Sequence, residues 1–233
     1  MSLIPKEEYI SKVNEYLLTH STRYTNQEIE ILKANAALGQ NTPFVHELLR
    51  QIYEETGLVT PGNSMYDEFV NILKTNFSIE RPMLEIAGGV IPSLGKKIAI
   101  NQHQGSITVY DPRLTGYSTD IPNLILKNEN FTENTDIGQA KMIIGFMPCD
   151  ATNMIIETAC KHNVDFMVAL CEGGMRKGYE FLEYDDEWIS HVKSNAKRHM
   201  RETSLGDLCE SSLEKFDNPY PIIYNKRKNL NEN

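Results

Sequence analysis

The sequence predicts an α/β protein with a Rossmann-like, doubly wound, mostly parallel sheet and an N-terminal helical cap. Residues 5–77 carry apolar side chains at three- and four-residue steps, as amphipathic helices do. After residue 80, short apolar runs alternate with helical stretches, which is typical of βα units. The runs IIGFM and FMVAL are entirely apolar, as expected of strands that are covered on both faces.

Residues 1–79 are predicted to form the helical cap. Helix-starting and helix-stopping residues divide this part into four helices, which are expected to begin before Ile10, at Thr25, at Thr42 and at Ser64. None of the four carries recognisable chemistry. We therefore interpret them as a cap packed on the larger domain, or alternatively as the wall of a substrate pocket.

Residues 80–233 are predicted to form the sheet domain. Strands are expected at 82–87, 106–110, 123–127, 141–147, 164–170 and 220–225. Helices are expected between them at about 92–103, 151–162, 185–201 and 204–215.

The composition narrows the class of partner and the compartment. The chain has 32 acidic and 23 basic residues and a net charge of -9, which disfavours a nucleic-acid partner. A nucleic acid could still bind through a local basic patch in the predicted helix at 185–201. The patch consists of Lys193, Lys197 and Arg201, with Arg198 and His199 beside them. No apolar run approaches the length of about 20 residues needed for a transmembrane helix, and the start does not resemble a signal peptide, so no membrane association is predicted. Four cysteines without a C-x-x-C pair indicate neither a metal site nor a disulfide framework, which favours the cytoplasm.

Candidate binding residues follow the first two predicted strands. Gly88 and Gly89 allow backbone amides to approach a ligand, and Pro92 suits the first turn of the next helix. Asp111 ends the second strand, 22 residues after Gly89, where a carboxylate can accept hydrogen bonds from the two hydroxyls of a ribose. The pattern favours a nucleoside cofactor; a tight turn followed by a turn-initiating Asp-Pro pair is the alternative.

The run LEIAGG, followed by VYDP and then by an apolar strand ending in FMPCD, resembles the class I S-adenosylmethionine-dependent methyltransferase superfamily over about residues 80–225. The resemblance implies a Rossmann-like fold and S-adenosylmethionine as cofactor. It further implies that the methionine part contacts the turn after the first strand, that the ribose contacts the end of the second, and that the adenine is flanked after the third. By this resemblance, Glu85, Ala87, Gly88 and Gly89 would contact the methionine part, Asp111 would contact the ribose, and Asn130 and Phe131 would flank the adenine.

The sequence departs from the superfamily pattern in two places. Ala87 and Ile91 stand where two of the turn's glycines are usual, and Ile91 narrows the space for a cofactor. After the fourth strand, Met147–Thr152 replaces the Asp/Asn-Pro-Pro-Tyr motif of many amino-group methyltransferases, so methylation of a base amino group loses support. A nicotinamide-dependent enzyme would need G-x-G-x-x-G, but two of those three places read Ala87 and Pro92.

Candidate catalytic residues follow the fourth and fifth strands. Asp150 and Glu172 are expected to serve as a base or to orient the acceptor; helix capping is the alternative for Asp150. Cys149 and Cys171 lie beside them, but no suitably spaced histidine supports a metal site with this pair. The predicted function is therefore a methyltransferase with a small-molecule or macromolecular acceptor that the sequence does not identify. The alternative is a non-catalytic Rossmann-like module for binding or assembly.

Overall fold

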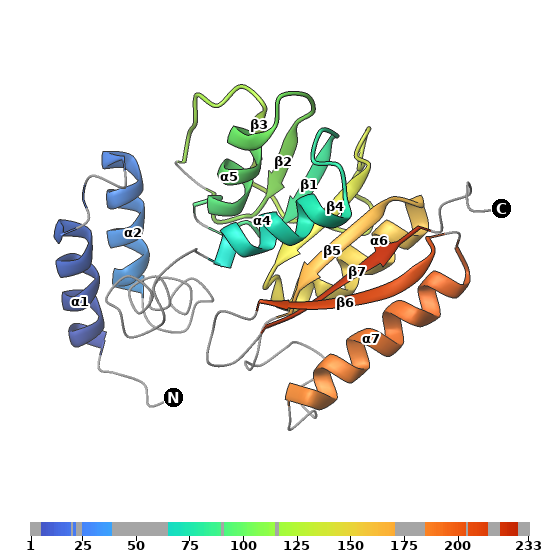
Figure 1. The fold of residues 1–233 in the computed structure, drawn as a ribbon. Helices are drawn as coiled ribbons and strands as arrows, with labels where there is room; N and C mark the ends of the chain where they lie inside the picture. The colour runs from blue at the N-terminus through green and yellow to red at the C-terminus, as the bar shows by residue number, and fades with distance from the viewer. Residues whose placement is uncertain are drawn as a thin grey trace.

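The computed structural model describes residues 6–19, 21, 25–38, 65–89, 91–114, 117–170, 185–203, 205–213 and 220–227. Its helices and strands are shown in Figure 1. The helices are α1 (Lys6–Thr19), α2 (Asn26–Leu38), α4 (Met65–Asn76), α5 (Ser93–Asn101), the short 3-10 helix η2 (Cys149–Ala151), α6 (Thr152–His162) and α7 (Asp185–Arg201). The strands are β1 (Met83–Ile86), β2 (Ile107–Tyr110), β3 (Leu124–Lys127), β4 (Met142–Phe146), β5 (Asp165–Ala169), β6 (Asp207–Leu213) and β7 (Tyr220–Lys226). The predicted third helix, from Thr42 to Gly57, lies outside the described residues.

The described strands form one sheet in the order β3-β2-β1-β4-β5-β7-β6. Strands β1 to β5 pair parallel with one another, with Met83 of β1 opposite Ile107 of β2 and Met142 of β4. Strand β7 pairs antiparallel with both β5 and β6. This topology confirms the predicted doubly wound, mostly parallel sheet.

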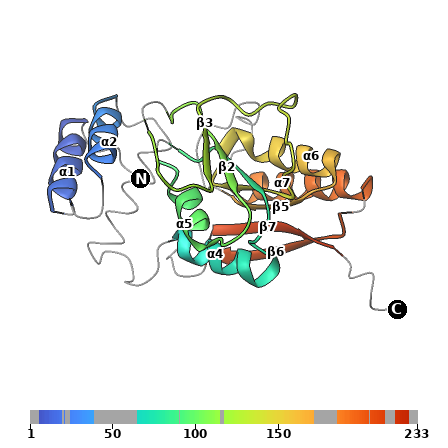
Figure 2. The same cartoon turned by 90° about the horizontal axis from the view of Figure 1, so that it is seen from above.

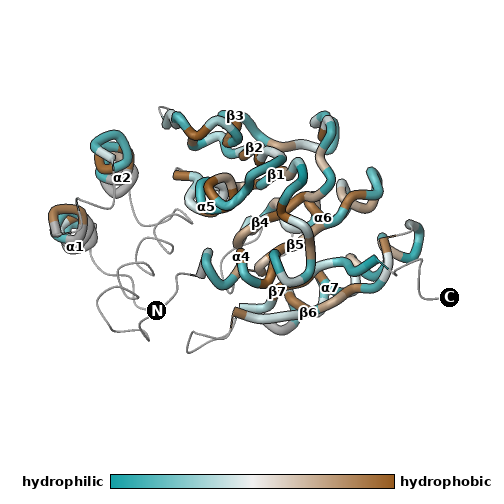
Figure 3. The backbone as a smooth tube through the Cα atoms, turned by 45° about the horizontal axis from the view of Figure 1, so that its top comes forward, coloured by the Kyte–Doolittle hydropathy of each residue, from teal (hydrophilic) through white to brown (hydrophobic). Residues whose placement is uncertain are grey.

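Helices cover both faces of the sheet. Figure 2 shows α4 and α5 on one side and α6 and α7 on the other. The core under α4 and α5 contains Phe69, Leu73 and Ile98, whereas the core under α6 and α7 contains Ile155 and Trp188. Because neighbouring strand residues point to opposite faces, β4 and β5 carry apolar side chains for both cores, which explains the apolar runs IIGFM and FMVAL. Figure 3 shows hydrophobic and hydrophilic residues on the turns of α5, as an amphipathic helix on a sheet requires.

Helix α4 belongs to the layer that covers the sheet. Phe69 and Leu73 of α4 have no exposed surface, and the Phe69 ring meets the Phe146 ring of β4 at 5.5 Å between centroids. The hydrophobic core of the sheet therefore includes residues before position 80, the position that we predicted as the boundary of the cap.

Helix α2 begins with a reciprocal capping arrangement and contacts the sheet domain. Thr25 Oγ1 accepts a 3.2 Å hydrogen bond from the Glu28 amide, and the Glu28 carboxylate accepts a 2.8 Å bond from the Thr25 amide. The same carboxylate accepts hydrogen bonds from Lys96 Nζ of α5 at 2.5 Å and from the Tyr117 hydroxyl at 3.2 Å. Glu28 is 2% exposed, so the start of α2 is held against α5 and the loop after β2 by a buried carboxylate.

The predicted helix at 204–215 is wrong. The structure places strand β6 there, paired with β7 along its whole length. Apolar residues at Leu205, Leu208, Cys209 and Leu213 have helical spacing, yet Leu208 contacts the core under α7 whereas Cys209 and Leu213 contact the opposite core. This division between two faces is a property of a strand, and pairing with β7 decided it.

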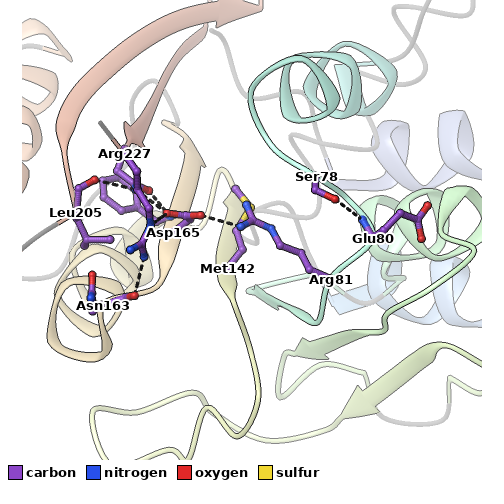
Figure 4. A network of polar contacts seen from close by, with 10 residues as sticks. Ser78, Glu80, Arg81, Met142, Asn163, Asp165, Leu205 and Arg227 are labelled. Atoms are coloured by element: carbon purple, nitrogen blue, oxygen red, sulfur yellow. Dashed lines mark hydrogen bonds and ion pairs between the residues drawn. The ribbon is translucent and has the colours of Figure 1, made fainter. Parts of the chain in front are cut away.

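A buried polar network connects strands at the amino-terminal edge of the parallel sheet (Figure 4). Asp165, the first residue of β5, accepts hydrogen bonds from Arg81 Nη1 at 2.7 Å, Arg227 Nε at 2.8 Å and Asn225 Nδ2 at 2.8 Å. Asn225 in turn accepts a 2.7 Å bond from the Phe166 amide. The network thereby ties β5 to β7 and to Arg81, two residues before β1.

Candidate functional site

The predicted site lies where β1, β2 and β4 end. Strand β1 pairs with β2 on one side and with β4 on the other, so the strand order reverses between β1 and β4. In doubly wound sheets, ligands bind beyond the carboxyl ends of the strands at this point. The turns that follow Ile86, Tyr110 and Phe146 therefore form the candidate site.

The turn after β1 contains two residues with a left-handed backbone. Ala87 has φ 63° and Gly89 has φ 81°. Glycine adopts this conformation readily, whereas for other residues it costs about 1–2 kcal/mol. The Ala87 amide donates a 2.9 Å hydrogen bond to the Tyr110 carbonyl, which holds the turn against the end of β2. The turn thus keeps a glycine-type backbone at position 87 although the residue is alanine. The side chain of Ile91, the other residue that replaces a usual glycine, is buried.

Glu85 lies beneath this turn and is 2% exposed. A Cβ atom at Gly88 would lie 2.3 Å from Val109 Cγ1 and 3.3 Å from Glu85 Cδ. A Cβ atom at Gly95, in α5, would lie 2.6 Å from Glu85 Oε2 and 2.6 Å from Val109 Cγ2. Both glycines therefore make room for the Glu85 carboxyl group between the turn, β2 and α5. Sequence reasoning missed Gly95, although a glycine inside a helical pattern is a signal of close packing.

Asp111, directly after β2, accepts four hydrogen bonds. Its Oδ2 accepts hydrogen bonds from the Gly89 amide at 2.9 Å and from Arg113 Nη2 at 2.7 Å. Its Oδ1 accepts hydrogen bonds from the Arg113 amide at 2.8 Å and from Arg113 Nε at 2.9 Å. The structure therefore brings two of the predicted residues, Gly89 and Asp111, into contact. It also adds Arg113, which sequence reasoning missed; an arginine near this acid is a known signal in dinucleotide-binding folds.

The surroundings of Asp111 favour its ionised form. Burial raises the pKa of a carboxyl group. Here the hydrogen bonds and charge of Arg113, together with the amides of Arg113 and Gly89, outweigh burial and lower the pKa of Asp111 below its ordinary value. Asp111 therefore presents a negative charge at the end of β2.

The two residues expected to flank an adenine lie differently. Asn130 is exposed, whereas Phe131 is 7% exposed and belongs to the core under α6 and α7. The Phe131 ring meets the Tyr110 ring edge-on, with 5.4 Å between centroids. Phe131 therefore lies against the end of β2, and its role toward a cofactor stays a prediction.

The turn after β4 also has an unusual backbone. Met147 has φ 51° and Cys149 has φ 48°, although neither is glycine. Cys149 Sγ lies 3.5 Å from the Met147 carbonyl oxygen, to which its thiol donates. Asp150 is exposed in η2, and the structure shows no side-chain cap on η2 or α6. Backbone strain of this kind is typical of functional sites, and three of the four left-handed non-glycine residues in the described chain follow β1 or β4.

Other predicted features lie elsewhere or outside the described residues. Glu172 and Cys171 are outside the part of the chain that the structure describes. In the basic patch of α7, Lys193 pairs with Glu210 at 2.6 Å and His199 lies 3.3 Å from Glu157. Within the described ranges, no three His, Cys, Asp or Glu residues are grouped so that they could hold a metal ion. Over the same ranges, none of the helices has the length and apolar character needed to cross a membrane.

Comparisons with known proteins identify the fold. No protein-family model matches the chain, and no curated protein sequence matches it. Among solved structures, the precorrin-6y C5,15-methyltransferase of Geobacter metallireducens GS-15 is similar with a TM-score of 0.51 at 13% identity, over 74% of this chain and 91% of that one. The magnesium protoporphyrin IX methyltransferase of Synechocystis PCC 6803, crystallised with S-adenosylmethionine, has a TM-score of 0.49 at 10% identity, over 98% of this chain and 100% of that one. Together with the strand order, the first similarity shows that this chain shares the Rossmann-like fold of that methyltransferase, as the sequence predicted.

Proposed function

We propose that this protein binds S-adenosylmethionine and transfers its methyl group to an acceptor. The observation that carries the proposal is the 2.9 Å hydrogen bond from the Gly89 amide to Asp111, which joins the turn after β1 to the end of β2. This contact brings the two predicted cofactor-binding segments together at the point where doubly wound sheets bind ligands. The methyltransferase fold of the chain supports the same conclusion.

The residues present fit this cofactor chemically. S-adenosylmethionine carries a sulfonium, an ammonium and two ribose hydroxyls, all of which favour carboxylate neighbours. Asp111 is ionised and would accept hydrogen bonds from the ribose hydroxyls. The Ala87–Gly89 turn, with the buried Glu85 packed against it, would hold the methionine part. Asn130 and Phe131 would flank the adenine. When bound, the cofactor supplies an electrophilic methyl group.

The turn after β4, together with Glu172, would position the acceptor. Asp150 is exposed directly after the strained turn at Met147 and Cys149, where its carboxylate can orient an acceptor or take its proton. Glu172, which follows β5 in the sequence and lies outside the described residues, would share this role. Methyl transfer to a nucleophile needs mainly in-line positioning, so a rigid, strained turn is a suitable platform.

The remaining parts of the chain suggest where the acceptor binds and where the protein works. Helix α2 of the predicted cap would lie on the acceptor side of the site, since Glu28 contacts Lys96 of α5 and Tyr117 in the loop after β2. The acceptor would be a small molecule or a macromolecule, and the net charge of -9 disfavours nucleic acid. Within the described residues, Cys149, Cys160 and Cys209 are not joined in disulfide bonds, which supports action in the cytoplasm.

Isothermal titration with S-adenosylmethionine and S-adenosylhomocysteine tests the proposal. We expect both to bind to the purified protein, and Asp111→Asn to weaken binding at least about tenfold because it removes the charge and one acceptor atom. Asp120→Asn makes the same chemical change at an exposed position and should leave affinity unchanged. No binding at millimolar ligand would refute the proposal and favour the non-catalytic module instead.

A further inference from the structure

Arg113 and Asp111 form a two-pronged ion pair at the end of β2. Nε and Nη2 of the guanidinium reach different oxygens of the carboxylate, at 2.9 Å and 2.7 Å. The Gly89 and Arg113 amides each supply one further hydrogen bond, so Asp111 accepts four hydrogen bonds, two on each oxygen. A carboxylate has about four lone-pair directions, which this arrangement uses.

The two guanidinium bonds have the pattern that a ribose would make. A vicinal diol presents two neighbouring O–H donors, which can reach the two oxygens of one carboxylate as the two N–H groups do here. The bonds from the Gly89 and Arg113 amides are part of the loop backbone and remain when a side chain moves. The guanidinium is therefore the group that can leave without unfolding the loop.

Exposure makes this movement feasible for one partner only. The Arg113 side chain is 34% exposed, whereas that of Asp111 is 2% exposed. Arg113 can rotate its guanidinium into water, where it is well solvated. Asp111 cannot turn outward, and after Arg113 leaves it needs two new donors.

We propose that Arg113 occupies the ribose-binding directions of Asp111 and must leave them for the nucleoside to bind, so that it lowers the affinity of the site for ligands with an intact vicinal diol. The inference rests on the proposed function and deepens it. Only a ligand that restores both hydrogen bonds to Asp111 compensates for the two that Arg113 gives up. A ligand with a single hydroxyl leaves one carboxylate direction without a donor, which is costly for a buried charge.

Titration of S-adenosylhomocysteine into Arg113→Ala tests the inference. We expect the dissociation constant to fall about tenfold relative to the wild type, because the ligand no longer competes with two charge-assisted hydrogen bonds on a partly exposed arginine. Arg113→Lys keeps the positive charge but loses the paired N–H donors of the guanidinium, so its dissociation constant should lie between those of the wild type and Arg113→Ala. Lys141→Ala, which removes one exposed positive charge before the start of β4 and thus at the opposite edge of the sheet, is the matched control and should change nothing.

A second ligand separates a diol effect from a general loss of charge. An analogue of S-adenosylhomocysteine whose ribose lacks both vicinal hydroxyls has no donor for Asp111 and leaves Arg113 in place, so for this ligand the gain in Arg113→Ala should shrink to less than about threefold. An equal gain for both ligands would show that Arg113 acts only through its charge and would overturn the inference.

Direct observation of Arg113 keeps the test independent of the variants' stability. In NMR spectra of the wild type, the Arg113 Nε–H signal should be protected from exchange with water and lose that protection on addition of S-adenosylhomocysteine. Two results would overturn the inference and leave the proposed function standing. In the first, the wild type binds S-adenosylhomocysteine but the Arg113 signal does not change. In the second, the wild type binds the ligand and folded Arg113→Ala binds it equally well or more weakly. Failure of both wild type and variant to bind would instead refute the proposed function, and the inference with it.

Discussion

Truncation of Asp165 to alanine should cost this protein a large part of its stability. Asp165 is the centre of the buried network at the amino-terminal edge of the sheet (Figure 4), where it accepts hydrogen bonds from Arg81, Asn225 and Arg227. Asp165→Ala leaves the Asn225 amide and the mostly buried Arg81 guanidinium without this acceptor. The side chains of Arg81 and Arg227 are 19% and 44% exposed, so Arg81 depends on Asp165 more than Arg227 does.

The size of the effect follows from the burial of these donors. A hydrogen bond to a charged group contributes about 1.5–3 kcal/mol, and breaking a buried ion pair costs about 3–5 kcal/mol. The Arg227 contribution is discounted because solvent screens a partly exposed pair. We therefore expect Asp165→Ala to lower the free energy of unfolding by about 3–4 kcal/mol.

Urea denaturation followed by circular dichroism measures this change. With an m-value of about 2 kcal/mol per molar urea, the midpoint should fall by about 1.5–2 M. Asp165→Asn keeps the side-chain volume and should lose about half as much, which separates charge from packing. Lys193→Ala breaks the more exposed pair with Glu210 and should cost less than about 1 kcal/mol. A loss below about 1 kcal/mol for Asp165→Ala would refute the view that this network stabilises the sheet.

Three further predictions concern the turn after β1 and its neighbours. Ala87→Gly should stabilise the fold by up to about 1 kcal/mol, because relief of the left-handed strain exceeds the entropy that glycine adds to the unfolded chain. Ala87→Val should destabilise the fold. Thermal unfolding measures the stability of both variants, and a destabilising glycine would contradict the reasoning. Gly95→Ala should destabilise the protein by about 1–3 kcal/mol, because its methyl group would meet Glu85 and Val109 at 2.6 Å; an unchanged melting temperature would show that α5 shifts freely. The pKa values of Asp111 and Asp165 are both lowered on folding, so their contribution to stability is present above the ordinary carboxyl pKa of about 4 and is lost as the pH falls through their folded values. When urea denaturation is measured from pH 7 down to pH 3, the midpoint should decrease below about pH 4, and the decrease should be smaller in Asp165→Asn. A midpoint independent of pH would contradict the lowered pKa values.

Much of the fold could be predicted because burial leaves a local record in the sequence. A strand covered on both faces needs apolar residues throughout, so IIGFM and FMVAL already identified β4 and β5. Helix α7 was predicted with the bounds that the structure shows. Residues 207–213 were predicted wrongly because their apolar spacing suits a helix as well as a strand, and only the partner β7 distinguishes the two.

For the candidate site, the sequence by itself determined which segments meet, and the tertiary structure decided how their side chains are used. Gly89 and Asp111 were each predicted to bind the cofactor at the end of a strand, and the hydrogen bond between them agrees with a site at the carboxyl ends of β1 and β2. That Arg113 folds back onto Asp111, that Gly95 makes room for Glu85, and that Ala87, Met147 and Cys149 adopt left-handed backbones was decided in three dimensions. The physical reason is that periodicity records which face of an element is buried, whereas the backbone angles of a turn and the contacts between elements depend on the packing of the whole sheet.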